Sequence, residues 1–175
     1  TCFFLIDGLN ERRANSSDLE WKGFVQLCML HPIRELLHQD PFTLRAYEKP
    51  RGYAGDANLL DFVYATDEGL GPPEGTSELG RKIFQYSTRT PLCEGVHTGA
   101  RLVAETVDRF ALERHRPSIL SVASGHLREA NLCGALKQRR IGRWVAMDSD
   151  TDSLEEVQRC FGRYGVETLA GTVRQ

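Results

Sequence analysis

The sequence predicts an α/β fold in which a helical part, residues 1–116, precedes the first half of an open parallel sheet, residues 117–175. Residues 1–116 contain amphipathic runs separated by turns rich in proline and glycine. After Pro117, short apolar runs alternate with helical patterns. This alternation indicates β-α-β units, because a strand that is buried on both faces of a parallel sheet is apolar throughout.

In the helical part, Asp18 suits the N-cap of an amphipathic run over residues 19–37, in which Pro32 should cause either a break into two helices or a kink. Residues 39–56 have the polar composition of a loop, and a short helix is expected over 57–64. Residues 69–75 again indicate a loop. Ser77 or Thr76 should cap a helix through Tyr86, and Pro91 should begin a long helix that ends near His115.

In the second part, we expect strands over residues 119–123, 144–147 and 166–169 and helices over 127–139 and 153–164. Ser153 and Glu156 have the spacing of a capping box. Lys137, Arg139 and Arg140 gather at the expected end of the helix over 127–139, where cations favour the helix dipole. Three parallel strands would leave an open edge, so the sheet is expected to be truncated at the C-terminus of this sequence.

The amino-acid composition argues against some classes of binding partner. The chain has 175 residues, of which 41% are hydrophobic and 26% charged, and a net charge of −2, which argues against nucleic acid or an anionic membrane as the main partner. The apolar start, residues 1–6, lacks the length and charged flank of a signal or membrane span. The five cysteines are scattered without Cys-x-x-Cys spacing, so we expect a cytoplasmic protein with no zinc site.

The turn after the first expected strand is small, and a carboxylate, Asp148, follows the second strand. Ligands of open α/β sheets lie at the carboxyl ends of the strands. Gly125 would let the backbone approach a nucleoside there, and Asp148 could accept hydrogen bonds from ribose hydroxyls. The NAD fingerprint requires three glycines beside a pyrophosphate, of which only Gly125 is present, whereas S-adenosylmethionine carries no phosphate.

Residues 119–126, Ile-Leu-Ser-Val-Ala-Ser-Gly-His, and 145–150, Val-Ala-Met-Asp-Ser-Asp, resemble the class I S-adenosylmethionine-dependent methyltransferases. In this chain Ser121 replaces the usual acid of the motif, Ala123 its first glycine and Leu127 its last. The resemblance implies a Rossmann-like methyltransferase sheet and S-adenosylmethionine as cofactor. The residues expected to bind it are Ala123, Ser124, Gly125, His126, Glu129, Asp148 and Ser149, with Glu129 supplying the carboxylate lost at Ser121.

The string Pro50-Arg-Gly-Tyr-Ala-Gly-Asp56 is similar to a bacterial group of such enzymes, labelled extracellular factor 3-hydroxypalmitic acid methyl ester biosynthesis proteins. The resemblance runs from Trp21 to the end of the chain and implies O-methylation of a 3-hydroxy fatty acid carboxylate. Arg51, Tyr53 and Asp56 are the catalytic candidates, because glycines in this turn allow a lid that faces the cofactor. The alternative is a rigid loop in which Arg51 and Asp56 pair with each other or with helix ends.

Methyl transfer from a sulfonium is an in-line displacement that needs no metal, and an ionised carboxylate needs no general base. The expected partner is thus a small-molecule acceptor, with a homodimer also possible. A second hypothesis is a catalytically silent cofactor-sensing or interaction module on a methyltransferase-like fold, which the departures at the glycine positions favour. A nicotinamide-dependent enzyme is a third hypothesis, and the missing glycines disfavour it.

Overall fold

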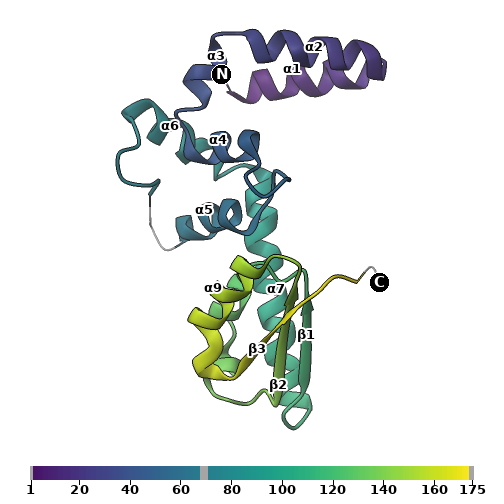
Figure 1. Cartoon of the computed structure of the whole chain (residues 1–175), viewed down its shortest axis with the longest axis vertical. Coiled ribbons are helices and arrows are strands. Elements are labelled where there is room, and N and C mark those ends of the chain that lie inside the picture. Colours follow the sequence, from purple (N-terminus) through teal and green to yellow (C-terminus); the bar gives the residue numbers. More distant parts are fainter. Residues whose placement is uncertain (1, 68–70, 174–175) are drawn as a thin grey trace.

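The computed structural model describes residues 2–67 and 71–173, and it has a helical part and an α/β part (Figure 1). The helices of the first part are α1 (Cys2–Ala14), α2 (Asp18–Leu30), α3 (Ile33–Leu37), α4 (Pro41–Glu48), α5 (Ala57–Asp67), α6 (Glu78–Ser87) and α7 (Pro91–Glu113). The second part contains β1 (Ser118–Val122), η1 (Arg128–Asn131), α8 (Gly134–Lys137), β2 (Arg143–Asp148), α9 (Thr151–Phe161), η2 (Gly162–Tyr164) and β3 (Val166–Ala170).

The three described strands form one parallel sheet in the order β1-β2-β3, and Leu120, Val145 and Glu167 lie in one row across it. This is the strand order of one half of a doubly wound α/β sheet. The predicted α/β class and the three predicted strands are therefore confirmed.

The core of the α/β part lies between one face of the sheet and the helices. Trp144 is 1% exposed at the start of β2, and its indole N–H donates to Ser121 Oγ at 3.0 Å. Helix α9 packs on β2 and β3, with Val157 and Phe161 in the core. The C-terminal half of α7 contributes Ala104, Val107 and Ala111 to the same core.

Helix α7 joins the two parts. Its N-terminal half buries Cys93, His97 and Ala100 on the side of the helical part, where α7 also contacts α5. Its C-terminal half contacts η1 and α8 and lies beside the sheet (Figure 1). The predicted boundary after residue 116 follows α7 in sequence, and it stays a prediction because α7 packs against elements on both sides of it.

Several helix starts agree with the sequence. His31 and Pro32 separate α2 from α3, Pro91 begins α7, and Ser77 Oγ accepts the Gly80 N–H at 3.0 Å at the start of α6. Two predicted caps were wrong by position. Ser17, not Asp18, caps α2 and forms a capping box with Glu20. Asp150 caps α9 instead of the predicted Ser153–Glu156 box, which leaves Ser153 buried within the first turn.

The expectation of a continuous loop over residues 39–56 was wrong, because α4 occupies its first half. The buried Asp40 accepts hydrogen bonds from Phe42 N and Thr43 N at 3.0 and 3.2 Å, and Pro41 occupies the first helical position. These are two recognised helix-start signals. Of the loop predicted over 69–75, residues 68–70 lie outside the described residues, and 71–75 contain neither helix nor strand.

The expected helix over residues 127–139 was also wrong, since the chain there forms the short η1 and α8. Leu127 adopts a left-handed conformation with φ 53°, which a continuous helix cannot contain. The carboxylate of Asp108 on α7 then accepts hydrogen bonds from Gly134 N and Ala135 N at 3.0 and 2.7 Å. A side chain from α7, which is distant in sequence, therefore caps the backbone where α8 begins at residue 134.

Candidate functional site

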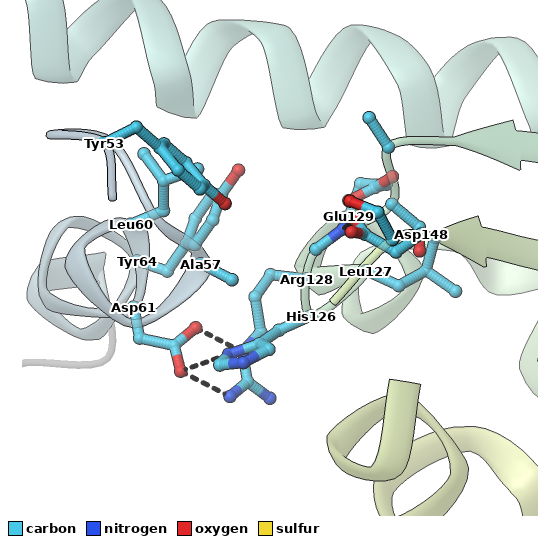
Figure 2. Close-up of a pocket in the computed structure, with 15 residues that line it drawn as sticks. Tyr53, Ala57, Leu60, Asp61, Tyr64, His126, Leu127, Arg128, Glu129 and Asp148 are labelled. Carbon is cyan, nitrogen blue, oxygen red and sulfur yellow. Dashed lines mark hydrogen bonds and ion pairs between the residues drawn. The ribbon is translucent and has the colours of Figure 1, made fainter. Parts of the chain in front are cut away.

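A cavity of about 470 Å³ lies at the carboxyl ends of β1 and β2, between the turn after β1 and helix α5 (Figure 2). Its volume is within the range of small-molecule sites. Its lining residues come from the loop before α5, from α5 itself and from the ends of both strands. They are Tyr53, Gly55, Ala57, Leu60, Asp61, Tyr64, Ala123, Ser124, Gly125, His126, Leu127, Arg128, Glu129, Asp148 and Ser149.

In the turn after β1, every second residue has a left-handed backbone conformation. Ala123, Gly125 and Leu127 have φ angles of 53°, 49° and 53°, a left-handed conformation that is uncommon for residues other than glycine. Ser124 N donates to Met147 O at 3.1 Å, which fixes the turn to the end of β2. A Cβ on Gly125 would lie 3.3 Å from the Ala57 side chain, so the turn approaches α5 closely.

Asp148 ends β2 at the wall of the cavity. Its Oδ2 accepts the Gly125 N–H at 2.8 Å, and its Oδ1 accepts the Asp150 N–H at 2.9 Å. A carboxylate has about four acceptor positions, so both oxygens can take a further hydrogen bond from a ligand. The residue is held in place by the backbone of the turn that it faces.

Asp61 on α5 connects the helical part to the turn. It accepts hydrogen bonds from Arg128 Nε and Nη2 at 2.6 and 2.7 Å, and its Oδ2 lies 2.8 Å from His126 Nδ1. Burial alone would raise the pKa of Asp61, but the Arg128 and His126 hydrogen bonds outweigh it and lower this pKa to about 2. The ionised carboxylate can only accept, so Nδ1 of His126 carries the proton in this pair. Figure 2 shows the contacts.

Burial affects the other ionisable groups of the cavity differently. It raises the pKa of Glu129, and it also raises the pKa of Tyr53 and Tyr64, helped by nearby carboxylates. Both phenols therefore stay protonated at neutral pH and can donate hydrogen bonds. Among the described residues, the buried hydroxyl of Ser124 has no hydrogen-bond partner.

The charge of the lining is acidic. It contains three carboxylates, those of Asp61, Glu129 and Asp148, against one guanidinium, that of Arg128. Arg128 is already paired with Asp61 and with Glu156, the latter at 2.9 Å. The arrangement suits a ligand with a positive charge and hydroxyl groups, and it would repel a phosphate.

All seven residues predicted to bind a cofactor line this cavity: Ala123, Ser124, Gly125, His126, Glu129, Asp148 and Ser149. Of the three loop candidates, Tyr53 lines it too, opposite Asp148 and Glu129 (Figure 2). The structure thus gathers residues from positions that are almost a hundred apart in sequence.

Arg51 and Asp56 are not among the lining residues. Arg51 forms an ion pair with Asp150 and donates to Ser153 Oγ at 2.9 Å, so it binds the N-terminal turn of α9. Asp56 is 1% exposed; it pairs with Arg45 at 2.7 Å and accepts the Leu59 N–H at 2.8 Å at the start of α5. Pairing of this kind is what the rigid-loop alternative expects.

The sequence pattern does not indicate Asp61, Tyr64 or Arg128 as site residues. Asp61 interrupts the apolar run Leu59-Leu60-Asp61-Phe62-Val63, and an acid inside such a run was the available signal. Nothing local pairs it with Arg128, which is 67 residues away.

Comparisons of the chain with family models, with curated proteins and with solved structures found no match. In the part of the chain that the structure describes, no three His, Cys, Asp or Glu side chains converge as metal ligands. No helix in the described ranges is long and apolar enough to cross a membrane.

Proposed function

We propose that this chain binds S-adenosylmethionine in the cavity at the ends of β1 and β2 and acts as a methyltransferase. The backbone of the turn carries the proposal. Ala123, Gly125 and Leu127 are left-handed at the three positions that the resembled family motif fills with glycine. Glycine is the residue that adopts this conformation without steric cost. The turn therefore has a backbone that suits glycine at all three positions, which supports the proposal although two of the three residues are not glycine.

The charge of the lining supports the same cofactor. S-adenosylmethionine has a positively charged sulfonium and an amino group, and the cavity offers the carboxylates of Glu129 and Asp148, while that of Asp61 is paired with Arg128. The pyrophosphate of a nicotinamide cofactor would face these carboxylates without an unpaired cation to bind it. Electrostatics thus favours the sulfonium compound over a dinucleotide.

Within the proposal, each wall of the cavity has its own role. Asp148 would accept hydrogen bonds from the ribose hydroxyls, and Glu129 with Ser124 would hold the amino-acid end of the cofactor. The bound cofactor supplies an electrophilic methyl group. Tyr53, Leu60 and Tyr64 form the opposite wall (Figure 2) and would position the acceptor for in-line attack.

A 3-hydroxy fatty acid is the acceptor that the resemblance indicates. Arg51 is held by Asp150, so we assign recognition of the acceptor carboxylate to the phenols of Tyr53 and Tyr64. Burial keeps both phenols protonated and able to donate. A cytoplasmic location and a homodimer are further parts of the proposal.

The cofactor is tested by calorimetric titration of S-adenosylmethionine. Loss of a charge-assisted ribose contact in Asp148→Ala should weaken binding by roughly 10- to 150-fold. Asp148→Asn retains an acceptor for the Gly125 N–H and should weaken binding too, whereas Asp7→Ala on the exposed face of α1 should not. Absence of binding by the parent chain would contradict the proposal.

Turnover is tested separately, with methyl-labelled cofactor and 3-hydroxyhexadecanoate. We expect a labelled methyl ester, formed more slowly by Tyr53→Phe and Tyr64→Phe than by the control Tyr47→Phe, whose side chain is exposed outside the cavity. Binding without methyl transfer to any acid would identify the chain as a cofactor-sensing module instead.

A further inference from the structure

A second cavity, of about 340 Å³, lies at the amino ends of the three strands. This end of the sheet is the one farthest from α5 (Figure 1). Its walls come from the segments that lead into β1, β2 and β3. The lining residues are Arg116, Leu136, Arg139, Ile141, Gly142, Arg143, Trp144, Gly162, Arg163, Tyr164 and Gly165. It is separate from the cavity at the carboxyl ends, and the function proposed above does not involve it.

Four arginines and no acid occur among these lining residues. Arg143 pairs with Glu167 at 2.8 Å, but both side chains are exposed, so the pair is open to exchange. The Arg163 guanidinium lies 4.8 Å from the centre of the Tyr164 ring. Among the described residues, the side chains of Arg116 and Arg139 form no hydrogen bond or ion pair. Positive charge therefore accumulates here in a chain whose net charge is −2.

The backbone holds these arginines together. A Cβ on Gly142 would lie 2.4 Å from Arg116 O, so the segments before β1 and β2 are in close contact. Gly142 N donates to Pro117 O at 2.9 Å across the same junction. Arg116 and Arg139 both have left-handed backbones, with φ angles of 49° and 55°. Such conformations are costly for residues with a Cβ and are found preferentially where a site needs a fixed geometry.

The helix dipole does not account for this cluster. The sequence predicted that Lys137, Arg139 and Arg140 lie at the end of a helix over 127–139. In the structure, α8 has only four residues and ends at Lys137. Arg116 and Arg163 come from other segments and share no helix with them. What the arginines have in common is the cavity itself.

We propose that this basic cavity binds a small anion that carries two or more phosphate groups. Guanidinium groups match phosphate oxygens in geometry as well as charge, and several of them around one cavity suit a polyphosphate better than a single carboxylate. The volume fits a pyrophosphate or a nucleoside diphosphate. The cavity is compact, whereas a nucleic-acid surface extends along a groove or helix face.

Calorimetric titration of pyrophosphate and of ADP into the whole chain, at constant ionic strength, tests the proposal. We expect saturable binding that Arg116→Gln/Arg139→Gln weakens about tenfold or more, because two charged donors are lost. The control Arg89→Gln/Arg101→Gln removes the same charge from exposed positions elsewhere and should change the affinity less than about twofold. Thermal unfolding shows whether each variant is folded, and Arg163→Gln replaces the double variant if it is not.

Equal affinity for pyrophosphate and ADP would assign recognition to the phosphates alone, and tighter binding of ADP would add the nucleoside; both results support the site. Absence of saturable binding, or equal weakening in the control variant, would overturn it. Binding of single-stranded DNA without binding of pyrophosphate would also overturn it, in favour of a nucleic-acid surface.

Discussion

Single carboxylates give the cavity at the ends of β1 and β2 its charge and link its walls to one another. Asp61 binds Arg128 with both oxygens and His126 with one of them, although its side chain is only 28% exposed. Asp148 is held in the same way by two backbone N–H groups. At the scale of residues, therefore, Arg128 and His126 hold the pKa of the half-buried Asp61 below its ordinary value, and two backbone N–H groups fix the orientation of Asp148.

Asp61 should make the free energy of unfolding depend on pH in the acidic range. Its pKa is lowered from 3.8 to about 2, so its contribution is complete above about pH 4 and is lost as the pH falls through 2. We expect the free energy of unfolding in urea to fall by about 2 kcal/mol more in the parent than in Asp61→Asn between pH 6 and pH 2. Parallel profiles for the two proteins would contradict this role.

Glu129 should make the affinity for the proposed cofactor depend on pH, at higher pH values than those at which Asp61 affects stability. Burial raises its pKa, and only the ionised form attracts a positively charged ligand. Binding of S-adenosylmethionine should thus weaken as the pH is lowered from 8 to 5. The dependence should be flatter in Glu129→Gln and unchanged in Glu155→Gln, an exposed position of α9. Titrations at both pH values measure it, and a dependence in Glu129→Gln as steep as in the parent would count against the assignment.

At the scale of elements, packing decides which glycines tolerate a side chain. Gly80 of α6 is buried, and a Cβ there would lie 2.2 Å from Gln39 O, between α3 and α4. Gly99 of α7 has no atom within 4 Å of such a Cβ. Close packing therefore excludes a side chain at Gly80, whereas the space around Gly99 would accommodate one.

Alanine at these positions should have effects of opposite sign. Gly80→Ala should destabilise the chain by about 1–3 kcal/mol, because a backbone carbonyl must move. Gly99→Ala should stabilise it by roughly 0.5–1 kcal/mol, since alanine restricts the unfolded chain and favours the helix. Urea unfolding of both variants measures this. An unchanged or higher stability of Gly80→Ala would show that the close approach at Gly80 is not strained, and destabilisation by Gly99→Ala would contradict the second expectation.

Element prediction from the sequence succeeded where local signals act alone. The capping by Ser77, the proline at the start of α7 and the break at Pro32 all depend on a few neighbouring residues. It failed over residues 127–139, where Asp108 from α7 caps the backbone of residues 134 and 135. It also failed at α4, whose start signals at Asp40 and Pro41 were present but were outweighed by the glycines that follow.

At the scale of the whole molecule, two ionic contacts among the described residues join the helical part to the α/β part beside the cavity. One is Arg51 with Asp150 and Ser153 on α9, and the other is Asp61 with Arg128 and His126. Helix α7 provides the apolar connection between the same two parts. We therefore expect that α4 and α5 can loosen from the cavity while α7 keeps the core of the sheet covered.

Removal of both ionic contacts should loosen α5 in particular. In Arg51→Gln/Asp61→Asn, amide hydrogen exchange in α4 and α5 should become about tenfold faster or more, because charge-assisted contacts are lost. Amides of β2 and β3 should be unaffected. The matched control is Arg143→Gln, which breaks an exposed ion pair with Glu167 on the sheet. A uniform acceleration across both parts would mean that they unfold as one unit.

The sequence by itself determined the α/β class, the three strands and the seven cofactor candidates that line one cavity, because strand ends in a parallel sheet meet at one edge. It could not determine the partners of Arg51, Asp61 and Asp108. Each contacts a residue far along the chain, 99 positions away for Arg51 and Asp150. Only the packing of α5, α7 and α9 around the sheet brings such pairs together, and no local pattern records it. The same packing brings four arginines from three separate segments around the second cavity.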